Sequence, residues 1–178
     1  MDLRDTPLAG VKLIEQACQN DERGYFGRLF CQRSLAERGV VFTPAQISVS
    51  FNRSRGTLRG MHYQRAPRQE RKIVMCLAGA IHDVALDLRP DSPTYRQWHA
   101  VTLRAGSGLA LLIPEGCAHG FQTLAEGALV GYIISAEYEV TAARGVRWDD
   151  PAFAIDWPLP VSVISHRDRS FPDYQEGA

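Results

Sequence analysis

Two histidines lie in segments that could do acid–base or metal chemistry. His62 is near the end of the alternating segment Leu58-Arg-Gly-Met-His-Tyr-Gln64, which also contains Arg59. A regular strand would turn these two side chains to opposite faces. A bulge at Gly60 would bring them to one cavity, because glycine inside a strand often marks a bulge or a close backbone approach. Taken alone, however, the pattern favours a surface arginine and a hydrogen-bonded core histidine.

His119 lies in Ile113-Pro-Glu-Gly-Cys-Ala-His-Gly-Phe121, where a turn leads into a strand. This spacing is common in metal-binding cupins, whose sites need two or three imidazoles and a carboxylate at about 2.0–2.2 Å from the ion. Such sites typically start from a His-x-His pair, and His62-Tyr-Gln64 lacks the second imidazole. The other histidines, His82, His99 and His166, are individually expected to be structural or exposed. We therefore predict no metal site.

The composition limits what kind of protein this is. With 178 residues, 45% of them hydrophobic and 22% charged, we expect one globular domain spanning residues 1–178. Twenty Lys+Arg balance twenty Asp+Glu, so no overall field attracts nucleic acid or an anionic membrane. We find no secretory signal and no apolar run near the roughly 18 residues of a membrane span. The four dispersed cysteines form no C-x-x-C pair, so we expect reduced thiols and a cytoplasmic protein.

Short apolar or alternating runs, broken by Gly, Pro, Asp or Ser, predict an all-β fold. Turn chemistry at Gly79 and at Arg104-Ala-Gly-Ser-Gly108 predicts that consecutive strands pair with each other. One short helix is expected at Arg33–Arg38, and the Pro-rich tail from Asp149 to Tyr174 is expected to wrap the outside of a two-sheet sandwich or jelly roll. The predicted strands are Val11–Glu15, Gln46–Asn52, Thr57–Tyr63, Lys72–Leu77, Ile81–Leu88, Gln97–Leu103, Leu109–Ile113, Ala118–Leu124 and Ala128–Ser135.

Seven motifs, in order along nearly the whole chain, resemble the dTDP-4-dehydrorhamnose 3,5-epimerase family. The resemblance implies a cupin-type jelly-roll β-sandwich, a homodimer with strands exchanged between subunits, a nucleotide-sugar substrate, and activity without a metal or other cofactor. The motifs are Arg23-Gly-Tyr-Phe26, Leu58-Arg-Gly-Met-His-Tyr-Gln64, Lys72-Ile-Val74, Asp83-Val-Ala-Leu-Asp-Leu-Arg89 with Ser92-Pro-Thr94, Ile113-Pro-Glu-Gly-Cys-Ala-His-Gly-Phe121, Trp148-Asp-Asp-Pro151 and Ile164-Ser-His-Arg-Asp168.

The resemblance also implies roles for individual residues. It makes His62 the general base, oriented by Asp168, and Tyr132 the general acid on the opposite face of the sugar. It places Lys72 beside the sugar carbonyl, with His119 and Asp83 lining or bracing the cavity. Without the resemblance, Lys72 would be a solvated residue at a strand start, Tyr132 a core residue with Tyr63 and Tyr138 as rival acids, and Asp168 part of a surface ion pair.

Further residues are implied to bind the nucleotide. Arg23 and Arg59 match positions that hold the diphosphate, for which the guanidinium fork is well suited. Phe26, Arg28, Gln46 and Ser48 complete the predicted binding set, and two of these depart from the family pattern. Arg28 replaces a common acidic residue and Ser48 a common asparagine, at positions resembling those that receive the base. If Arg28 points inward, a base that presents acceptors, such as cytosine, would suit it better than thymine.

The reading with most support is an epimerase acting at C3, C5 or both on a nucleotide-linked 4-keto-6-deoxyhexose, converting dTDP-4-dehydro-6-deoxyglucose to dTDP-4-dehydrorhamnose. The ketone makes both neighbouring C–H groups acidic enough for an imidazole base. Alternatives are a single-centre epimerase on a dTDP- or CDP-linked sugar, a cupin ketoisomerase, a non-catalytic sugar-binding cupin, and a metal-dependent oxygenase. Tyr132 together with Lys72 favours epimerisation over ketoisomerisation, and purification with bound iron, nickel or manganese would identify the oxygenase.

Overall fold

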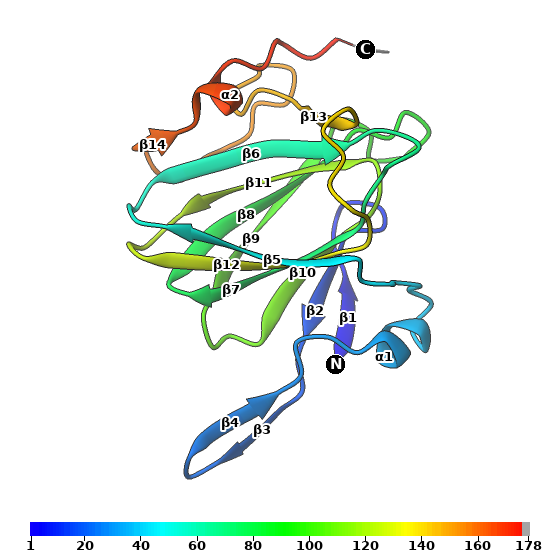
Figure 1. Cartoon of the computed structure of the whole chain (residues 1–178), viewed down its shortest axis with the longest axis vertical. Helices are drawn as coiled ribbons and strands as arrows, with labels where there is room; N and C mark the ends of the chain where they lie inside the picture. The colour runs from blue at the N-terminus through cyan, green and yellow to red at the C-terminus, as the bar shows by residue number, and fades with distance from the viewer. Residues whose placement is uncertain (176–178) are drawn as a thin grey trace.

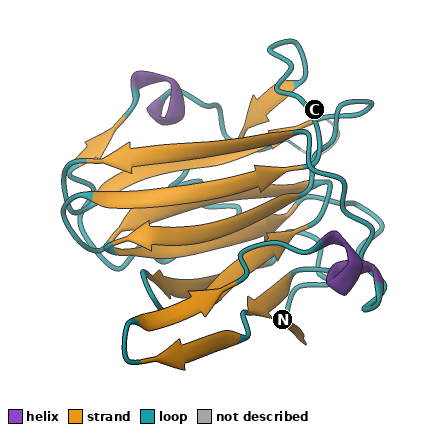
Figure 2. Cartoon of the chain, turned by 60° about the horizontal axis from the view of Figure 1, so that its bottom comes forward, coloured by secondary structure: helices purple, strands orange, loops and turns teal. Residues whose placement is uncertain are grey.

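Two antiparallel sheets face each other across an apolar core in a computed structural model that describes residues 1–175 (Figures 1 and 2). The first sheet has the order β1 (Asp2–Asp5), β2 (Lys12–Glu15), β10 (Leu109–Ile113), β7 (Lys72–Ala78), β12 (Ala128–Ile134) and β5 (Gln46–Asn52). The second has the order β13 (Ala143–Gly145), β6 (Thr57–Gln64), β11 (Cys117–Thr123), β8 (Ala80–Asp87) and β9 (Trp98–Arg104), and the short strand β14 (Val163–Ile164) runs parallel to β6.

The prediction of an all-β jelly-roll sandwich is confirmed, and each of the nine predicted strands ends within one residue of the observed strand. The predicted short helix is α1 (Gln32–Ala36). The remaining elements have no alternating apolar signal in the sequence, because they are short and polar or lie in loops. These are β1, β13 and β14, the hairpin of β3 (Cys18–Asp21) and β4 (Gly24–Gly27), and the second helix α2 (His166–Arg169).

The expected pairing of consecutive strands is wrong at both turns on which it rested. Gly79 joins β7 to β8, and residues 104–108 join β9 to β10, and each connection passes from one sheet to the other. Positive φ at Gly79 (74°) and at Gly106 (74°) allows a sharp change of direction. Such a turn does not choose between a hairpin and a corner of the sandwich, because that choice depends on which neighbours bury the strand's apolar side chains.

The core lies in layers that follow the two sheets. Side chains from both sheets, including Val74, Leu111, Phe121 and Val130, fill the space between them. The outer face of the second sheet is covered by the C-terminal segment, residues 146–174, through Phe153 and other apolar side chains. The predicted wrapping of the Pro-rich tail is therefore confirmed, and Figure 1 shows this segment lying over β6.

Hydrogen bonds fix the C-terminal segment along its length. The indole N–H of Trp98 donates to the carbonyl of Phe153 at 3.1 Å. The side-chain amide of Gln122 pairs with the backbone of Leu159 in both directions, at 2.8 and 3.0 Å. These contacts and the β14–β6 pairing hold α2 against β6, which positions the residues of α2 for the site described below.

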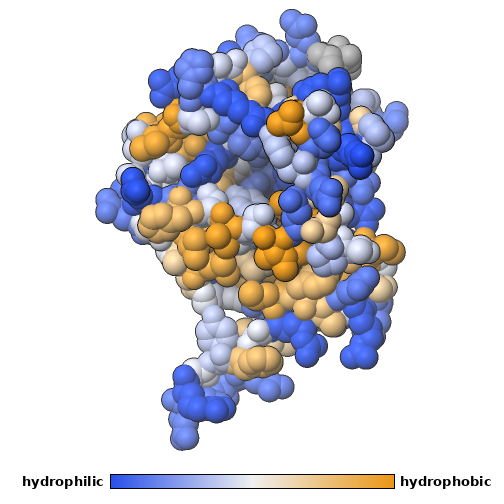
Figure 3. All heavy atoms as spheres, viewed as in Figure 1, coloured by the Kyte–Doolittle hydropathy of each residue, from blue (hydrophilic) through white to orange (hydrophobic). Residues whose placement is uncertain are grey.

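Two exposed features lie on the side of the molecule that the first sheet forms. The hairpin of β3 and β4, here called the arm, projects away from the sandwich (Figures 1 and 2). Strand β5 forms one edge of the first sheet, and its side chains Ile47, Val49 and Phe51 are exposed. Figure 3 shows hydrophobic atoms gathered across the middle of the face that β5 occupies, beside a hollow. Within residues 1–175, no helix is long and apolar enough to cross a membrane.

Candidate active site

A cavity of about 320 Å³ lies between the two sheets, lined from one side by β5, β7 and β12 and from the other by β6 and β11. It brings together residues that are far apart in the sequence. Seven of the twelve predicted site residues line it directly: His62, Tyr132, Lys72, Gln46, Ser48, Arg59 and His119.

A bulge at Gly60 brings Arg59 and His62 into this cavity together. The register pairs His62 with His119 and Arg59 with Phe121, so that β6 has one residue more than β11 between the two pairs. Gly60 has φ 139°, and a Cβ added there would lie 2.5 Å from a backbone Cα of β11. No other residue fits this approach, which explains the glycine. The sequence offered this bulge as the alternative to a surface arginine and a core histidine, and the structure contains it.

His62 is paired with Asp168 of α2. The distance between Nε2 of His62 and Oδ1 of Asp168 is 2.7 Å, and the other carboxylate oxygen accepts the backbone N–H of Gly60 at 3.2 Å. Burial raises the pKa of Asp168, but the hydrogen bonds from His62 and from the Gly60 amide outweigh it and leave the pKa below its ordinary value. Asp168 is therefore a buried carboxylate that orients the His62 ring by binding Nε2. The other ring nitrogen, Nδ1, is not bonded to Asp168.

A second histidine–aspartate pair lies beside the first. Nε2 of His119 is 2.8 Å from Oδ1 of Asp83 on the neighbouring strand β8, and both side chains are buried. The second oxygen of Asp83 is buried without a hydrogen-bond partner among the described residues. Asp83 thus braces His119 from behind the cavity and does not line it, which is one of the two roles that the resemblance implied.

Tyr132 lies on β12, in the sheet opposite to His62. Its ring meets the ring of His119 edge to face, with centroids 5.9 Å apart. Burial raises the pKa of the Tyr132 phenol, and the negative charge of Asp83 raises it further, while Arg59 partly opposes this. The side chain is therefore a protonated phenol over the whole physiological range, which is the state that a proton donor needs.

Lys72 begins β7 and reaches across the cavity toward β6. Its ammonium donates to the backbone carbonyl of His62 at 3.2 Å and lies 2.8 Å from Oε1 of Glu70. The side chains of Lys72 and Glu70 are each only 10% exposed. Lys72 is therefore an ordered cation of the cavity and not a solvated residue at a strand start.

The sequence analysis assigned no role to several cavity residues. Glu70 and Arg144 carry no motif of their own, so no signal could have found them. Arg167 falls inside a quoted motif, and its guanidinium donates to the hydroxyl of Tyr138 at 3.5 Å. Tyr138 and Tyr63, which the sequence offered as rival acids, also line the cavity.

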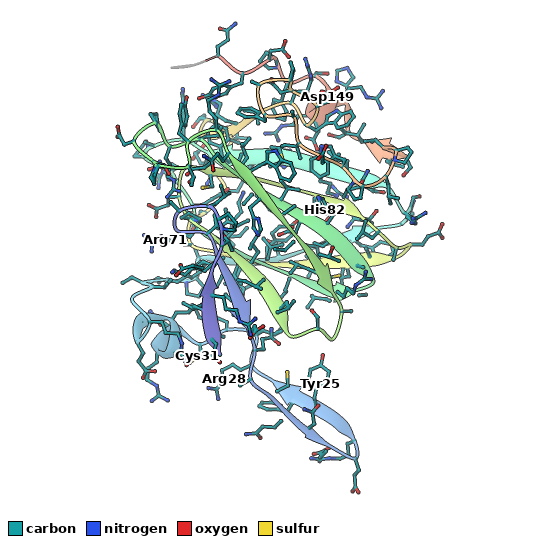
Figure 4. All side chains as sticks on the ribbon, turned by 180° about the vertical axis from the view of Figure 1, so that it is seen from behind. Tyr25, Arg28, Cys31, Arg71, His82 and Asp149 are labelled. Carbon is teal, nitrogen blue, oxygen red and sulfur yellow. The ribbon has the colours of Figure 1, made fainter. Side chains whose placement is uncertain are left out.

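Three predicted binding residues, Arg23, Phe26 and Arg28, lie outside this chain's cavity. All belong to the arm or its base, where Arg23 pairs with Asp21 at 2.5 Å and Phe26 is 72% exposed. Figure 4 shows the labelled Arg28 at the base of the arm, apart from the sandwich. Within one chain they do not join the other site residues, so a role for them at the substrate stays a prediction that requires a second copy.

The donor set does not form a ready metal site among residues 1–175. In that range, no three His, Cys, Asp or Glu side chains are grouped as metal ligands would be. His62 and His119 are each bonded to their own aspartate, and the four cysteines are free. What the cavity offers is proton transfer: a histidine with an orienting carboxylate, a protonated phenol on the opposite sheet, and a lysine whose ammonium contacts the histidine's backbone carbonyl.

A cavity of this kind in a two-sheet jelly roll defines an acid–base enzyme site. Residues 5–176 match the family described as dTDP-4-dehydrorhamnose 3,5-epimerase, and this chain belongs to that family. It is 38% identical over 181 residues to the dTDP-4-dehydrorhamnose 3,5-epimerase of Sinorhizobium fredii, covering 99% of this chain and 91% of that protein.

Two solved structures of the family have the same fold. The Bacillus anthracis dTDP-4-dehydrorhamnose 3,5-epimerase with TDP and PPi bound has a TM-score of 0.94 and 36% identity, covering 97% of this chain and 99% of that one. The Legionella pneumophila dTDP-6-deoxy-D-glucose-3,5-epimerase, in complex with dTDP-4-keto-L-rhamnose, has a TM-score of 0.89 and 34% identity, covering 98% of each chain.

Proposed function

We propose that this protein is an isomerase that inverts C3 and C5 of dTDP-4-dehydro-6-deoxyglucose to form dTDP-4-dehydrorhamnose. The proposal rests on one observation above all: His62, which is paired with Asp168, and Tyr132 line a single cavity from opposite sheets. Inversion at carbon requires removal of a proton from one face and delivery from the other. An acid and a base on facing sheets meet that requirement.

The first step is removal of a proton next to the ketone. Nδ1 of His62 takes the proton, because Nε2 is bonded to Asp168. The C–H electron pair moves into the carbonyl and forms an enolate, and the Asp168 carboxylate stabilises the imidazolium that results. A sugar without the ketone would be inert, since its C–H electrons would have no such acceptor.

The second step is stabilisation of the enolate and reprotonation. The Lys72 ammonium stabilises the negative oxygen, an effect worth about 3 kcal/mol for a well-placed donor in a dry site. Tyr132 then gives its phenolic proton to the carbon from the other face, and the inverted ketone forms. The raised pKa of Tyr132 keeps the proton in place until the strongly basic enolate is present.

Cationic groups at the cavity favour a nucleoside diphosphate sugar. Arg59, Arg144 and Arg167 all line it, and the Arg59 guanidinium is oriented by a 2.8 Å hydrogen bond to Asn52. A guanidinium binds phosphate oxygens through parallel N–H groups. With a net charge of zero over the whole chain, this local charge supports a small anionic substrate and not nucleic acid or a membrane surface.

We further propose that the enzyme works as a homodimer with exchanged arms. The unpaired edge of β5 and its exposed side chains Ile47, Val49 and Phe51 form a surface that a second copy would cover. In such a dimer the arm of one subunit, with Arg23, Phe26 and Arg28, would reach the cavity of the other. A cytoplasmic location stays a prediction from the sequence.

The experiment that tests the function is proton NMR in D₂O. The protein is incubated with dTDP-4-keto-6-deoxyglucose or its CDP analogue, and the H3 and H5 signals are followed beside His62→Ala and Tyr132→Phe variants. Loss of both signals with formation of the inverted sugar, abolished by His62→Ala, is the expected result. Exchange at one carbon would show that the protein is a single-centre epimerase, and formation of a carbonyl at C3 would show that it is a ketoisomerase. An unchanged spectrum with both substrates would refute the proposal.

The same assay tests the preference for a base. Arg28 replaces an acidic residue common in the family, so we propose that the arm tolerates a base with acceptor groups such as cytosine. Affinities for thymidine, cytidine, uridine and guanosine diphosphates are compared in wild type and Arg28→Glu. A thymidine preference that Arg28→Glu leaves unchanged would refute a role for Arg28 in choosing the base.

A further inference from the structure

Glu70 is an acidic group inside a cavity that is otherwise suited to anions. It lies in the loop before β7, and its side chain lines the cavity and is 10% exposed. Its carboxylate would repel the diphosphate of a substrate and the enolate that the reaction forms. An acid at this place therefore needs a compensating role, and its ion pair with Lys72 at 2.8 Å indicates what that role is.

The hydrogen bonds of Lys72 leave one donor available. A lysine ammonium has three N–H donors on a flexible stem of four carbons, so it has no fixed direction of its own. Here one N–H is directed to Oε1 of Glu70 and a second to the carbonyl of His62 at 3.2 Å. Two acceptors from different strands or loops fix the nitrogen, and the third N–H is the one that can meet a substrate oxygen.

The carboxylate also offsets the cost of burying the ammonium. A cation in a largely buried cavity loses hydration, and a neighbouring carboxylate compensates for that loss. The pair therefore differs from an exposed ion pair, which contributes little. The neighbouring pair of Arg71 with Glu115 supplies such a case: it spans 3.5 Å, and the two side chains are 35% and 45% exposed.

We propose that Glu70 is a positioning residue of the reaction: it holds the Lys72 ammonium so that its third N–H is directed at the oxygen of the keto sugar. The proposal rests on the proposed function. If the proposal is right, Glu70 acts only through Lys72. When Lys72 is absent, Glu70 weakens substrate binding, because its carboxylate is then buried without a partner.

The test is a double-mutant cycle with Glu70→Gln and Lys72→Met. We expect Glu70→Gln to lower kcat and the rate of H3 and H5 exchange by about 10-fold or more, because the cation is misdirected, while the affinity for thymidine diphosphate does not fall. In the Lys72→Met background the same substitution should have no further cost and should raise the affinity for thymidine diphosphate. Glu115→Gln is the matched control and should behave as wild type.

Two further readouts separate positioning from a structural role. Glu70→Asp keeps the charge on a shorter stem, so its kcat should lie between those of Glu70→Gln and wild type, and thermal unfolding checks that all variants are folded. An equal loss of kcat on Glu70→Gln in both backgrounds, or no loss in the wild-type background, would overturn the proposal while the proposed function stands. A wild-type protein that exchanges neither proton would instead refute the proposed function, and the role of Glu70 with it.

Discussion

Replacing Gly60 by alanine tests whether the bulge in β6 builds the site. The new methyl group would lie 2.5 Å from a backbone Cα of β11, and φ would stay near 139°, a region essentially limited to glycine. The backbone conformation costs about 1–3 kcal/mol, and displacing the facing strand costs about 1–3 kcal/mol more. We expect a total near 4 kcal/mol, which at about 2–4 °C per kcal/mol for a chain of this length lowers Tm by about 8–16 °C.

Gly127→Ala is the matched control. Gly127 also has positive φ, 64°, but a Cβ added there would meet nothing within 4 Å. The Gly127→Ala variant loses only the free energy of the backbone conformation, about 1–2 kcal/mol. Its Tm should therefore fall by only about 2–8 °C. The difference between the two variants isolates the close approach of β6 to β11.

The assay combines thermal unfolding with calorimetric binding of thymidine diphosphate. Flattening the bulge would turn Arg59 away from the cavity, because Arg59 and His62 share a face only through the extra residue. Gly60→Ala should therefore bind the diphosphate more weakly, whereas Gly127→Ala should not. Equal Tm values for the two variants, with equal affinity for the diphosphate, would refute this account of the bulge.

Four further predictions follow from the cavity residues and from the exposed strand β5. Asp168→Asn removes the charge that stabilises the His62 imidazolium, so kcat should fall by about 10²–10⁴ with diphosphate binding retained, and wild-type kcat in this variant would contradict the assignment. Because the folded pKa of Asp168 is depressed, its carboxylate stabilises the protein above the unfolded pKa of about 3.9 and loses this effect as pH falls through the folded pKa. The difference in unfolding free energy between wild type and Asp168→Asn, measured in urea, should therefore shrink on acidification. Tyr132→Phe should still exchange protons with D₂O through His62 but release no inverted sugar, and inverted product would rule Tyr132 out as the acid. Ile47→Glu places a charge on the exposed side of β5 and should shift a dimer to monomers of low activity in analytical ultracentrifugation, whereas an intact dimer would remove β5 from the proposed interface.

The sequence predicted the strands well because each has a strong local signal. Strand Cys117–Thr123 is buried along its whole length and strand Ala80–Asp87 at every position except His82, so their apolar or small residues mark them. Strand Cys18–Asp21 was missed because it is mostly exposed, and Ala143–Gly145 because it is only three residues long and half-buried, so neither has such a pattern. The pairing of strands was predicted wrongly because it depends on contacts between distant segments, which turn residues like Gly79 do not report.

The cavity residues also divide into those with a local sequence signal and those defined by contacts between distant segments. Arg59 and His62 could be placed together from the sequence, since a glycine between them suggested the bulge that the structure contains. The roles of Asp168 and Tyr132 came from a family resemblance, because each is ordinary in its local sequence. Glu70 could not be found, since its importance arises from the 2.8 Å contact with Lys72 and from burial, and neither is visible in a string of residues.

The contact between His62 and Asp168 joins residues 106 positions apart in the sequence. The catalytic pair therefore forms only after nearly the whole chain has been synthesised. Chains are synthesised from the N-terminus, and structure forms as segments emerge. Every strand of the two main sheets, β14 included, is synthesised before Asp168. A nascent chain can thus assemble the sandwich and the cavity while its histidine has no carboxylate to orient it. The base becomes competent last, which delays chemistry until the walls that must confine it are in place.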